Sequence, residues 1–326
     1  MTLPLFGAAI VPTFLVLWYF LSHDLHPEPR WVLWRTFWLG VSTTIPAGLA
    51  ELAQAKLLEP AALGPWGSSL GAAFLGAALC EELLKFCVVY FYCAKQAAFD
   101  EPMDGIVYGV TASLGFATLE NVLYVADNGM GVAVVRALLA VPGHACYGAI
   151  MGYFVAQHRF GPVERRRTNL ALAVALPIAL HGAYDTPLML LSQPSGGVDA
   201  ALPWLWVPIA VVVLGWRFAI RKVLELQREQ AGYPAADVAL NAKPQPPRGS
   251  GFAKWLKLGV GGTLAAWGGL VTVAVLGAVA MGTVTPGEAA DLLLGTAFIG
   301  ALPLAVGLLL FRRGMTSPAK HPFSSH

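Results

Sequence analysis

Two adjacent glutamates, Glu81 and Glu82, stand near the centre of an apolar stretch that runs from residue 69 to residue 93. A carboxylate inside a membrane costs at least about 2.5 kcal/mol on insertion scales, so such acids usually mark function. Lys85 lies four residues after Glu81, on the same helical face, and can offset one charge. Glu82 is rotated from that face by about 100° and is expected to have no partner within its own helix. Two close carboxyl groups could then supply the acid and the base of a hydrolysis.

Two histidines and further polar side chains lie at a similar depth in the later apolar stretches. His144 and His181 fall near the midpoints of their stretches, and Asp185 follows one helical turn after His181. A carboxylate at that spacing can fix the imidazole tautomer and support a positive charge on the ring. Glu120, which Asn121 follows, lies about five residues past the midpoint of its stretch, roughly 8 Å toward the outer face at a rise of about 1.5 Å per residue, and Asp185 is displaced the same way. We therefore expect these residues to meet at one depth.

The elements that must position these residues are transmembrane helices. The chain of 326 residues is 56% hydrophobic and only 12% charged, whereas an average soluble domain is about 25% charged. A hydrocarbon core about 30 Å thick needs roughly 20 apolar residues in a helix. Nine such stretches are predicted, at residues 3–22, 31–53, 69–93, 103–126, 131–156, 169–191, 202–219, 256–281 and 291–311. The predicted fold class is all-α, a polytopic transmembrane bundle of about nine spans.

Basic residues are distributed unevenly over the loops that connect these spans. One alternating set of loops carries most of them, including Arg165, Arg166 and Arg167, and the other set carries only Lys56. The positive-inside rule then places the N-terminus outside and the C-terminus in the cytoplasm. Arg136, just inside the fifth stretch, is interpreted as an edge residue that reaches the membrane surface. The net charge of +2 gives no reason to expect nucleic acid as a partner.

The chain divides at residues 221–255, where charged residues are followed by a proline-rich and glycine-rich run. This composition predicts a cytoplasmic linker. Residues 1–220 form a seven-span body that holds all of the polar clusters. Residues 256–313 are predicted to be a pair of transmembrane helices that packs or binds a partner, and residues 314–326 a disordered tail.

Five short motifs occur in order between residues 80 and 185 of the seven-span body. They are Cys-Glu-Glu-Leu-Leu-Lys (80–85), Asp-Glu-Pro-Met-Asp-Gly-Ile-Val-Tyr-Gly (100–109), Gly-Phe-Ala-Thr-Leu-Glu-Asn (115–121), Pro-Gly-His (142–144) and His-Gly-Ala-Tyr-Asp (181–185). Together they resemble the PrsW family of bacterial intramembrane proteases, which is related to the CAAX prenyl proteases and the abortive-infection membrane proteases. The form Glu-Glu-x-x-Lys differs from the CAAX branch, which usually has arginine one position later. A prenylated substrate is therefore less expected.

The resemblance implies a glutamic-type endopeptidase in a bacterial inner or plasma membrane. Its substrate would be a protein anchored in the same lipid bilayer, and anti-sigma factors are the known substrate class of the family. The residues that carry over as catalytic are Glu81, Glu82, His144, His181 and Asp185, and the supporting residues are Lys85, Glu120 and Asn121. No cofactor is expected on this interpretation.

A mechanism can be written from the residues themselves. Glu81 or Glu82 takes a proton from the attacking water and returns one to the leaving amine, while His181 and His144 face the developing oxyanion. The same two glutamates and two histidines could instead bind zinc, as in a CAAX-like metalloprotease. In a third reading, the cluster serves a non-catalytic scaffold or a proton-linked carrier.

Small residues lead along the same helix toward the glutamates. Ala73 and Ala77 lie on one line with Glu81. Peptide hydrolysis inside a membrane needs water, so these positions are predicted to line a hydrated groove that opens to the outside.

Overall fold

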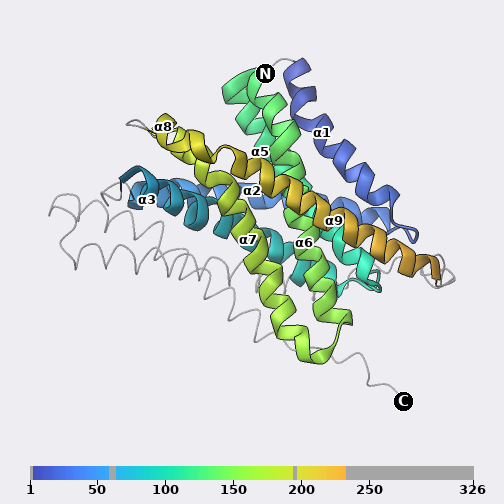
Figure 1. Cartoon of the computed structure of the whole chain (residues 1–326). Helices are drawn as coiled ribbons and strands as arrows, with labels where there is room; N and C mark the ends of the chain where they lie inside the picture. Colours follow the sequence, from blue (N-terminus) through green and yellow to red (C-terminus); the bar gives the residue numbers. More distant parts are fainter. Residues whose placement is uncertain (1–2, 59–63, 194–196, 233–326) are drawn as a thin grey trace, which may run out of the picture. The chain divides into compact units, whose positions relative to one another are not determined.

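A computed structural model of the chain describes residues 3–58, 64–193 and 197–232. Every regular element among these described residues is a helix (Figure 1). This confirms the predicted all-α class for this part of the chain. The count of nine spans and the orientation with the N-terminus outside stay predictions.

The C-terminal predictions fall mostly beyond this part of the chain. The helical pair at 256–313 and the tail at 314–326 lie outside the described residues, as does the linker after residue 232. The last described helix continues through Gly232, past residue 220, where the linker is predicted to begin. Val223 and Leu226 are buried on this helix, because apolar residues at helical spacing are interleaved with the charges that suggested a linker.

The helices follow one another with short connections. They are α1 (Leu3–Ser22), α2 (Arg30–Leu58), α3 (Gly64–Leu70), the π-helical η1 (Gly71–Ala78), α4 (Leu79–Cys87), the π-helical η2 (Val88–Tyr92), the short η3 (Cys93–Lys95), α5 (Pro102–Val135), the π-helical η4 (Arg136–Ala140), α6 (Val141–Phe160), the short η5 (Val163–Arg165), α7 (Arg166–Leu191), α8 (Gly197–Ala201), the short η6 (Leu202–Trp204) and α9 (Trp206–Gly232). The glutamates therefore lie on a regular α-helical segment between two π-helical ones.

Four helical runs among the described residues are long and apolar enough to cross a membrane. They are Pro4–Ser22, Pro102–Phe160, Val163–Leu191 and Gly197–Ala231. The second run breaks at Gly129, whose backbone has φ of 78° and ψ of −163°. A positive φ of this kind favours glycine because it has no Cβ. The break falls between the two spans that the sequence predicts at 103–126 and 131–156.

α5 packs against α1, α2 and α6. Its crossing with α6 is made by glycines from both helices. A Cβ at Gly109 would collide with the carbonyl oxygen of Gly148, and a Cβ at Gly152 would collide with that of Gly105. Small residues at this four-residue spacing let transmembrane helices approach backbone to backbone. The crossing fixes the register of α5 against α6, which carry the Glu120 and His144 side chains.

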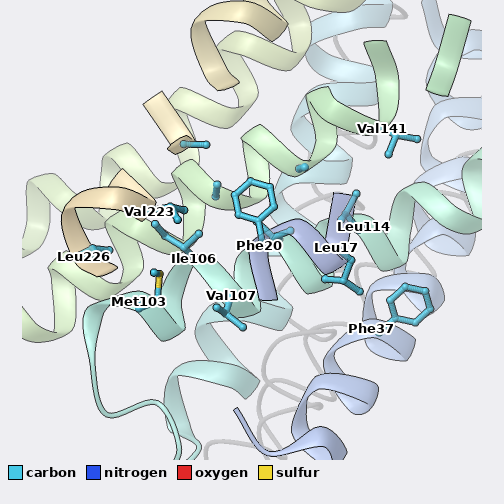
Figure 2. Close-up of a cluster of buried hydrophobic side chains, with 14 residues drawn as sticks. Leu17, Phe20, Phe37, Met103, Ile106, Val107, Leu114, Val141, Val223 and Leu226 are labelled. Carbon is cyan, nitrogen blue, oxygen red and sulfur yellow. The ribbon is translucent and has the colours of Figure 1, made fainter. Parts of the chain in front are cut away.

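A hydrophobic cluster joins α1 and α9 to this central pair (Figure 2). Leu17 and Phe20 of α1 contribute to it, together with Leu114 of α5 and Val223 of α9. Phe37 brings α2 into the same cluster. The helices that carry the polar residues are thus held by apolar packing.

Candidate active site

Lys85 lies at the centre of the polar cluster on α4. Its side chain is fully buried, and its ammonium donates to Glu81 Oε2 at 2.9 Å and to Glu82 Oε1 at 2.8 Å. The prediction that Glu82 has no partner within its own helix is wrong. Residues three apart on a helix are neighbours as well as residues four apart, so one lysine reaches both carboxylates.

His181 on α7 connects the glutamate pair to Asp185. Its Nδ1 lies 2.8 Å from Glu82 Oε1, and its Nε2 lies 3.1 Å from Asp185 Oδ2. The contact expected from the four-residue spacing of His181 and Asp185 is therefore present. Carboxylate oxygens accept hydrogen bonds, so both ring nitrogens donate in this arrangement and the ring is an imidazolium.

His144 on α6 is held in the opposite way. Its Nδ1 lies 3.2 Å from Lys85 Nζ, and its Nε2 lies 2.9 Å from Glu120 Oε2. An ammonium can only donate, so Nδ1 accepts and Nε2 carries the proton. His144 is therefore a neutral imidazole that bridges Lys85 and Glu120 through its two ring nitrogens.

Arg136 belongs to the cluster, although its sequence position suggested an edge residue. Its guanidinium donates to Glu120 Oε2 at 2.7 Å and to Asn121 Oδ1 at 2.6 Å. The same group lies over the ring of Tyr124, 4.2 Å from its centroid. The turn at Gly129 brings η4 back against the end of α5, so residues 15 and 16 positions apart meet. The signal in the sequence was Glu120, a membrane carboxylate that needed a cation.

Glu51 on α2 is the second residue that sequence reasoning missed. It lies close enough to Glu81 to interact with it electrostatically. α2 therefore adds a third carboxyl group beside the glutamate pair, and no spacing rule within α4 could have indicated it.

Aromatic rings surround the charged groups and keep the local environment apolar. The Tyr147 ring stacks on His181 with centroids 5.1 Å apart. Lys85 Nζ lies 4.0 Å from the centroid of the Phe116 ring. Electrostatic interactions are stronger in such surroundings than in water, so the cluster acts as one connected unit. All eight side chains predicted from the sequence are in it: Glu81, Glu82, Lys85, Glu120, Asn121, His144, His181 and Asp185.

Comparisons with known proteins show the family to which the chain belongs. The sequence model of the family described as PrsW family intramembrane metalloprotease matches residues 28–215, more than half of the chain. This chain belongs to the PrsW family. It is therefore an intramembrane peptidase, the class of enzyme that defines the family.

Several bacterial PrsW proteins are similar to the chain over most of their own length. Protease PrsW of Geobacillus kaustophilus is 37% identical over 74% of this chain and 98% of the relative. Protease PrsW of Bacillus subtilis is 37% identical over 66% of this chain and 92% of the relative. Protease PrsW of Clostridioides difficile is 31% identical over 58% of this chain and 81% of the relative. No solved structure matches the chain.

The description of the PrsW family as metalloproteases raises the question whether this cluster fits a metal ion. Glu81, Glu82 and His181 each offer one ligand atom, and these atoms lie within 4.8 Å of one another. Glu82 Oε2 is buried without a hydrogen-bond partner among the described residues, so it is an acceptor in need of a cation or a donor. Two carboxylates and one imidazole are a ligand set that zinc accepts. The three residues therefore fit a metal, whereas His144, which the sequence also suggested as a ligand, is not part of this group of ligand atoms.

The predicted hydrated groove of this PrsW member is not formed in the structure. Ala73 is fully buried and Ala77 is 4% exposed, because η1 packs against α7. The prediction of an open groove along these alanines is therefore wrong for this conformation. η1 and η2 flank α4 as π-helical segments, a form that is rare and often found at functional sites.

Proposed function

We propose that the cluster hydrolyses a peptide bond in a membrane-tethered protein, within or beside the bilayer. The single observation that carries this proposal is the pair Glu81 and Glu82, buried together with an imidazolium at hydrogen-bonding distance. An anti-sigma factor is the substrate class that the family resemblance implies. The chain's own contribution would be acid–base chemistry in a site shielded from bulk water.

The contacts favour Glu82 as the general base. Its Oε1 accepts from both Lys85 and His181, while its Oε2 is left without a partner among the described residues. Oε2 is thus oriented by the contacts of the other oxygen and can accept a proton from the attacking water. Glu82 then delivers this proton to the leaving amine. Glu81 stays paired with Lys85 and keeps the ammonium in place.

His181 would stabilise the oxyanion that forms on the scissile carbonyl. A protonated carboxyl is a weaker acceptor than a carboxylate, so uptake of a proton by Glu82 loosens the bond from His181 Nδ1. That N–H group can then turn to the developing charge, as an oxyanion donor does. Asp185 holds the opposite nitrogen at 3.1 Å and keeps the ring charged.

As an alternative to the role of His181 as an oxyanion donor, we propose that Glu81, Glu82 and His181 would hold a zinc ion. Zinc bound in this way would lower the pKa of a bound water to about 7 and polarise the substrate carbonyl. The histidine Nδ1 must lose its proton on loading. Asp185 would then orient the ring from the other side, as carboxylates do for metal-bound histidines.

The test is to replace the two glutamates separately. Glu82→Gln keeps the shape of the side chain and removes its basicity, so we expect fragment release from a membrane-anchored reporter to fall at least about 100-fold. Fragment release should fall less in Glu81→Gln, because Glu81 mainly holds Lys85 in place. Glu225→Gln is the matched control, because Glu225 is exposed and pairs with Lys222 outside the cluster.

The measurement is the rate of fragment release in cells and in proteoliposomes, normalised to the amount of folded protein. Unchanged release in Glu82→Gln would exclude Glu82 as the base. If neither glutamine variant changes release, but both lower the amount of folded protein, the scaffold reading would replace the proposal.

A further inference from the structure

A separate cavity lies at the other end of the helices that carry the cluster. Its volume is about 340 Å³, and its lining residues are Tyr90, Ala94, Lys95, Val155, His158, Arg159 and Arg166. His158 and His144 are both on α6, 14 residues apart, which places them roughly 20 Å apart along the helix. The cavity is therefore distinct from the candidate active site.

The lining is strongly basic. Lys95, Arg159 and Arg166 are all exposed and come from η3, α6 and α7, and the lining contains no carboxylate. Asp100 interacts electrostatically with Arg159 but is not part of the lining. The cavity thus gathers three cationic side chains from three segments around one space.

Of the three cationic groups, that of Arg159 is held in place by its neighbours. Arg159 Cζ lies 5.3 Å from the ring centroids of both Phe99 and Phe160, and its guanidinium donates to the carbonyl oxygen of Ala94. The Nδ1 of His158 lies 3.0 Å from the carbonyl oxygen of Arg166. Because that oxygen only accepts, Nδ1 donates, and this bond ties the end of α6 to the start of α7.

We propose that this cavity binds the phosphate of an anionic membrane lipid. A guanidinium offers a planar pair of donors that matches a phosphate, and lysine adds a point charge. The cavity lies where helices end on the arginine-rich side, which the positive-inside rule assigns to the cytoplasm. Basic pockets between transmembrane helices on that side bind anionic lipid head groups. Val155 and Ala94 give the remaining lining an apolar character, and the space exceeds what a lone phosphate ion fills.

The test compares two double variants of the full chain. Arg159→Gln with Arg166→Gln removes two cations from the cavity lining. Arg165→Gln with Arg167→Gln is the matched control, because it removes the same charge from neighbouring exposed positions outside the lining. Retention of phosphatidylglycerol by the purified protein is measured by native mass spectrometry, with phosphatidylcholine as the zwitterionic comparison. We expect the lining pair to weaken retention about tenfold through lost charge-assisted bonds, and the control pair to stay within about twofold.

Arg166→Gln alone serves if the double variant does not fold, because it leaves the contacts of Arg159 with the two rings intact. It should weaken retention at least about threefold. Equal weakening by the control pair, or unchanged retention in the lining variants, would overturn the assignment. A titration with inorganic phosphate distinguishes the source. Phosphate at millimolar concentration should not displace the lipid, and displacement would show that the site prefers the free ion.

Discussion

Lys85 decides whether the buried charges of the cluster are tolerable. Carboxylates taken out of water are costly, and their attraction to a partner offsets that cost only when the hydrogen bonds are complete. Although Glu82 Oε2 is left without a partner among the described residues, Lys85 supplies a hydrogen-bonded cation to two carboxylates at once and also contacts His144. Arg136 does the same for Glu120 at the other end of the network. The catalytic pair therefore depends on a residue that takes no part in the proposed proton transfer.

Replacement of Lys85 by methionine should destabilise the protein strongly. The change leaves Glu81 and Glu82 buried without their shared cation, and breaking a buried pair in this way costs about 3–5 kcal/mol. Adding Glu82→Gln to Lys85→Met removes one of the uncompensated charges and should recover part of the loss. The free energy of unfolding of the three variants in detergent forms a double-mutant cycle that measures the coupling.

A matched control for this cycle is Lys222→Met. Lys222 also pairs with a glutamate on its own helix, Glu225, but in an exposed position. Such surface pairs contribute at most about 1 kcal/mol, so the control should change stability little. If Lys85→Met is no more destabilising than Lys222→Met, the cluster does not depend on its lysine.

At the scale of the elements, the glycine crossing of α5 and α6 aligns the two halves of the site. Gly109→Ala places a Cβ against the Gly148 carbonyl oxygen, so the helices must move apart. We expect the free energy of unfolding to fall by about 1–3 kcal/mol, as for overpacked cores, together with reduced peptidase activity.

Gly131→Ala is the control for this change, because nothing lies within 4 Å of a Cβ there. It should be neutral or stabilising by up to about 1 kcal/mol, as alanine favours a helix. Thermal unfolding and fragment release measure both effects, and equal behaviour of the two variants would contradict the close crossing.

We expect the loop between α1 and α2 to make the stability of the fold sensitive to pH. Glu28 in this loop is 8% exposed and accepts a hydrogen bond from the Tyr108 hydroxyl on α5. Burial and the nearby Asp104 raise the pKa of Glu28 from 4.5 to about 10. The folded state therefore holds a proton that the unfolded state has lost, and stability falls as the pH rises from 4.5 toward 10.

Glu28→Gln should remove this dependence. The glutamine oxygen can still accept from Tyr108, and no proton is lost as the pH rises. We expect the variant to unfold at a higher temperature than the parent at pH about 9 and to show a flatter profile between pH about 6 and about 9. Glu225→Gln, at an exposed carboxylate, should follow the parent. A profile for Glu28→Gln as steep as that of the parent would contradict the raised pKa.

At the scale of the whole molecule, the helices and the residues of the site could be predicted from the sequence. The contacts between residues on different helices could not. Periodicity within one helix predicted the contacts of Lys85 with Glu81 and of His181 with Asp185, because helical geometry alone determines them. Glu51 and Arg136 were missed because tertiary packing determines their contacts: α2 lies beside α4, and the turn at Gly129 folds η4 back on α5. Lys85 reaches Glu82 as well because a flexible side chain can serve two neighbours on one face. The prediction of a groove along Ala73 was wrong because of tertiary packing as well, since α7 covers that face.

The proposed zinc site makes a prediction for the protein as a whole. A ligand that binds only the folded state raises the unfolding temperature, so treatment with a chelator should lower both that temperature and peptidase activity. Added zinc should restore both. Glu82→Gln removes one of the three ligands, and its unfolding temperature should no longer respond to chelator or zinc, whereas Glu225→Gln should respond like the parent. Activity and unfolding temperature that both withstand the chelator would exclude zinc and leave the glutamates to activate water by themselves.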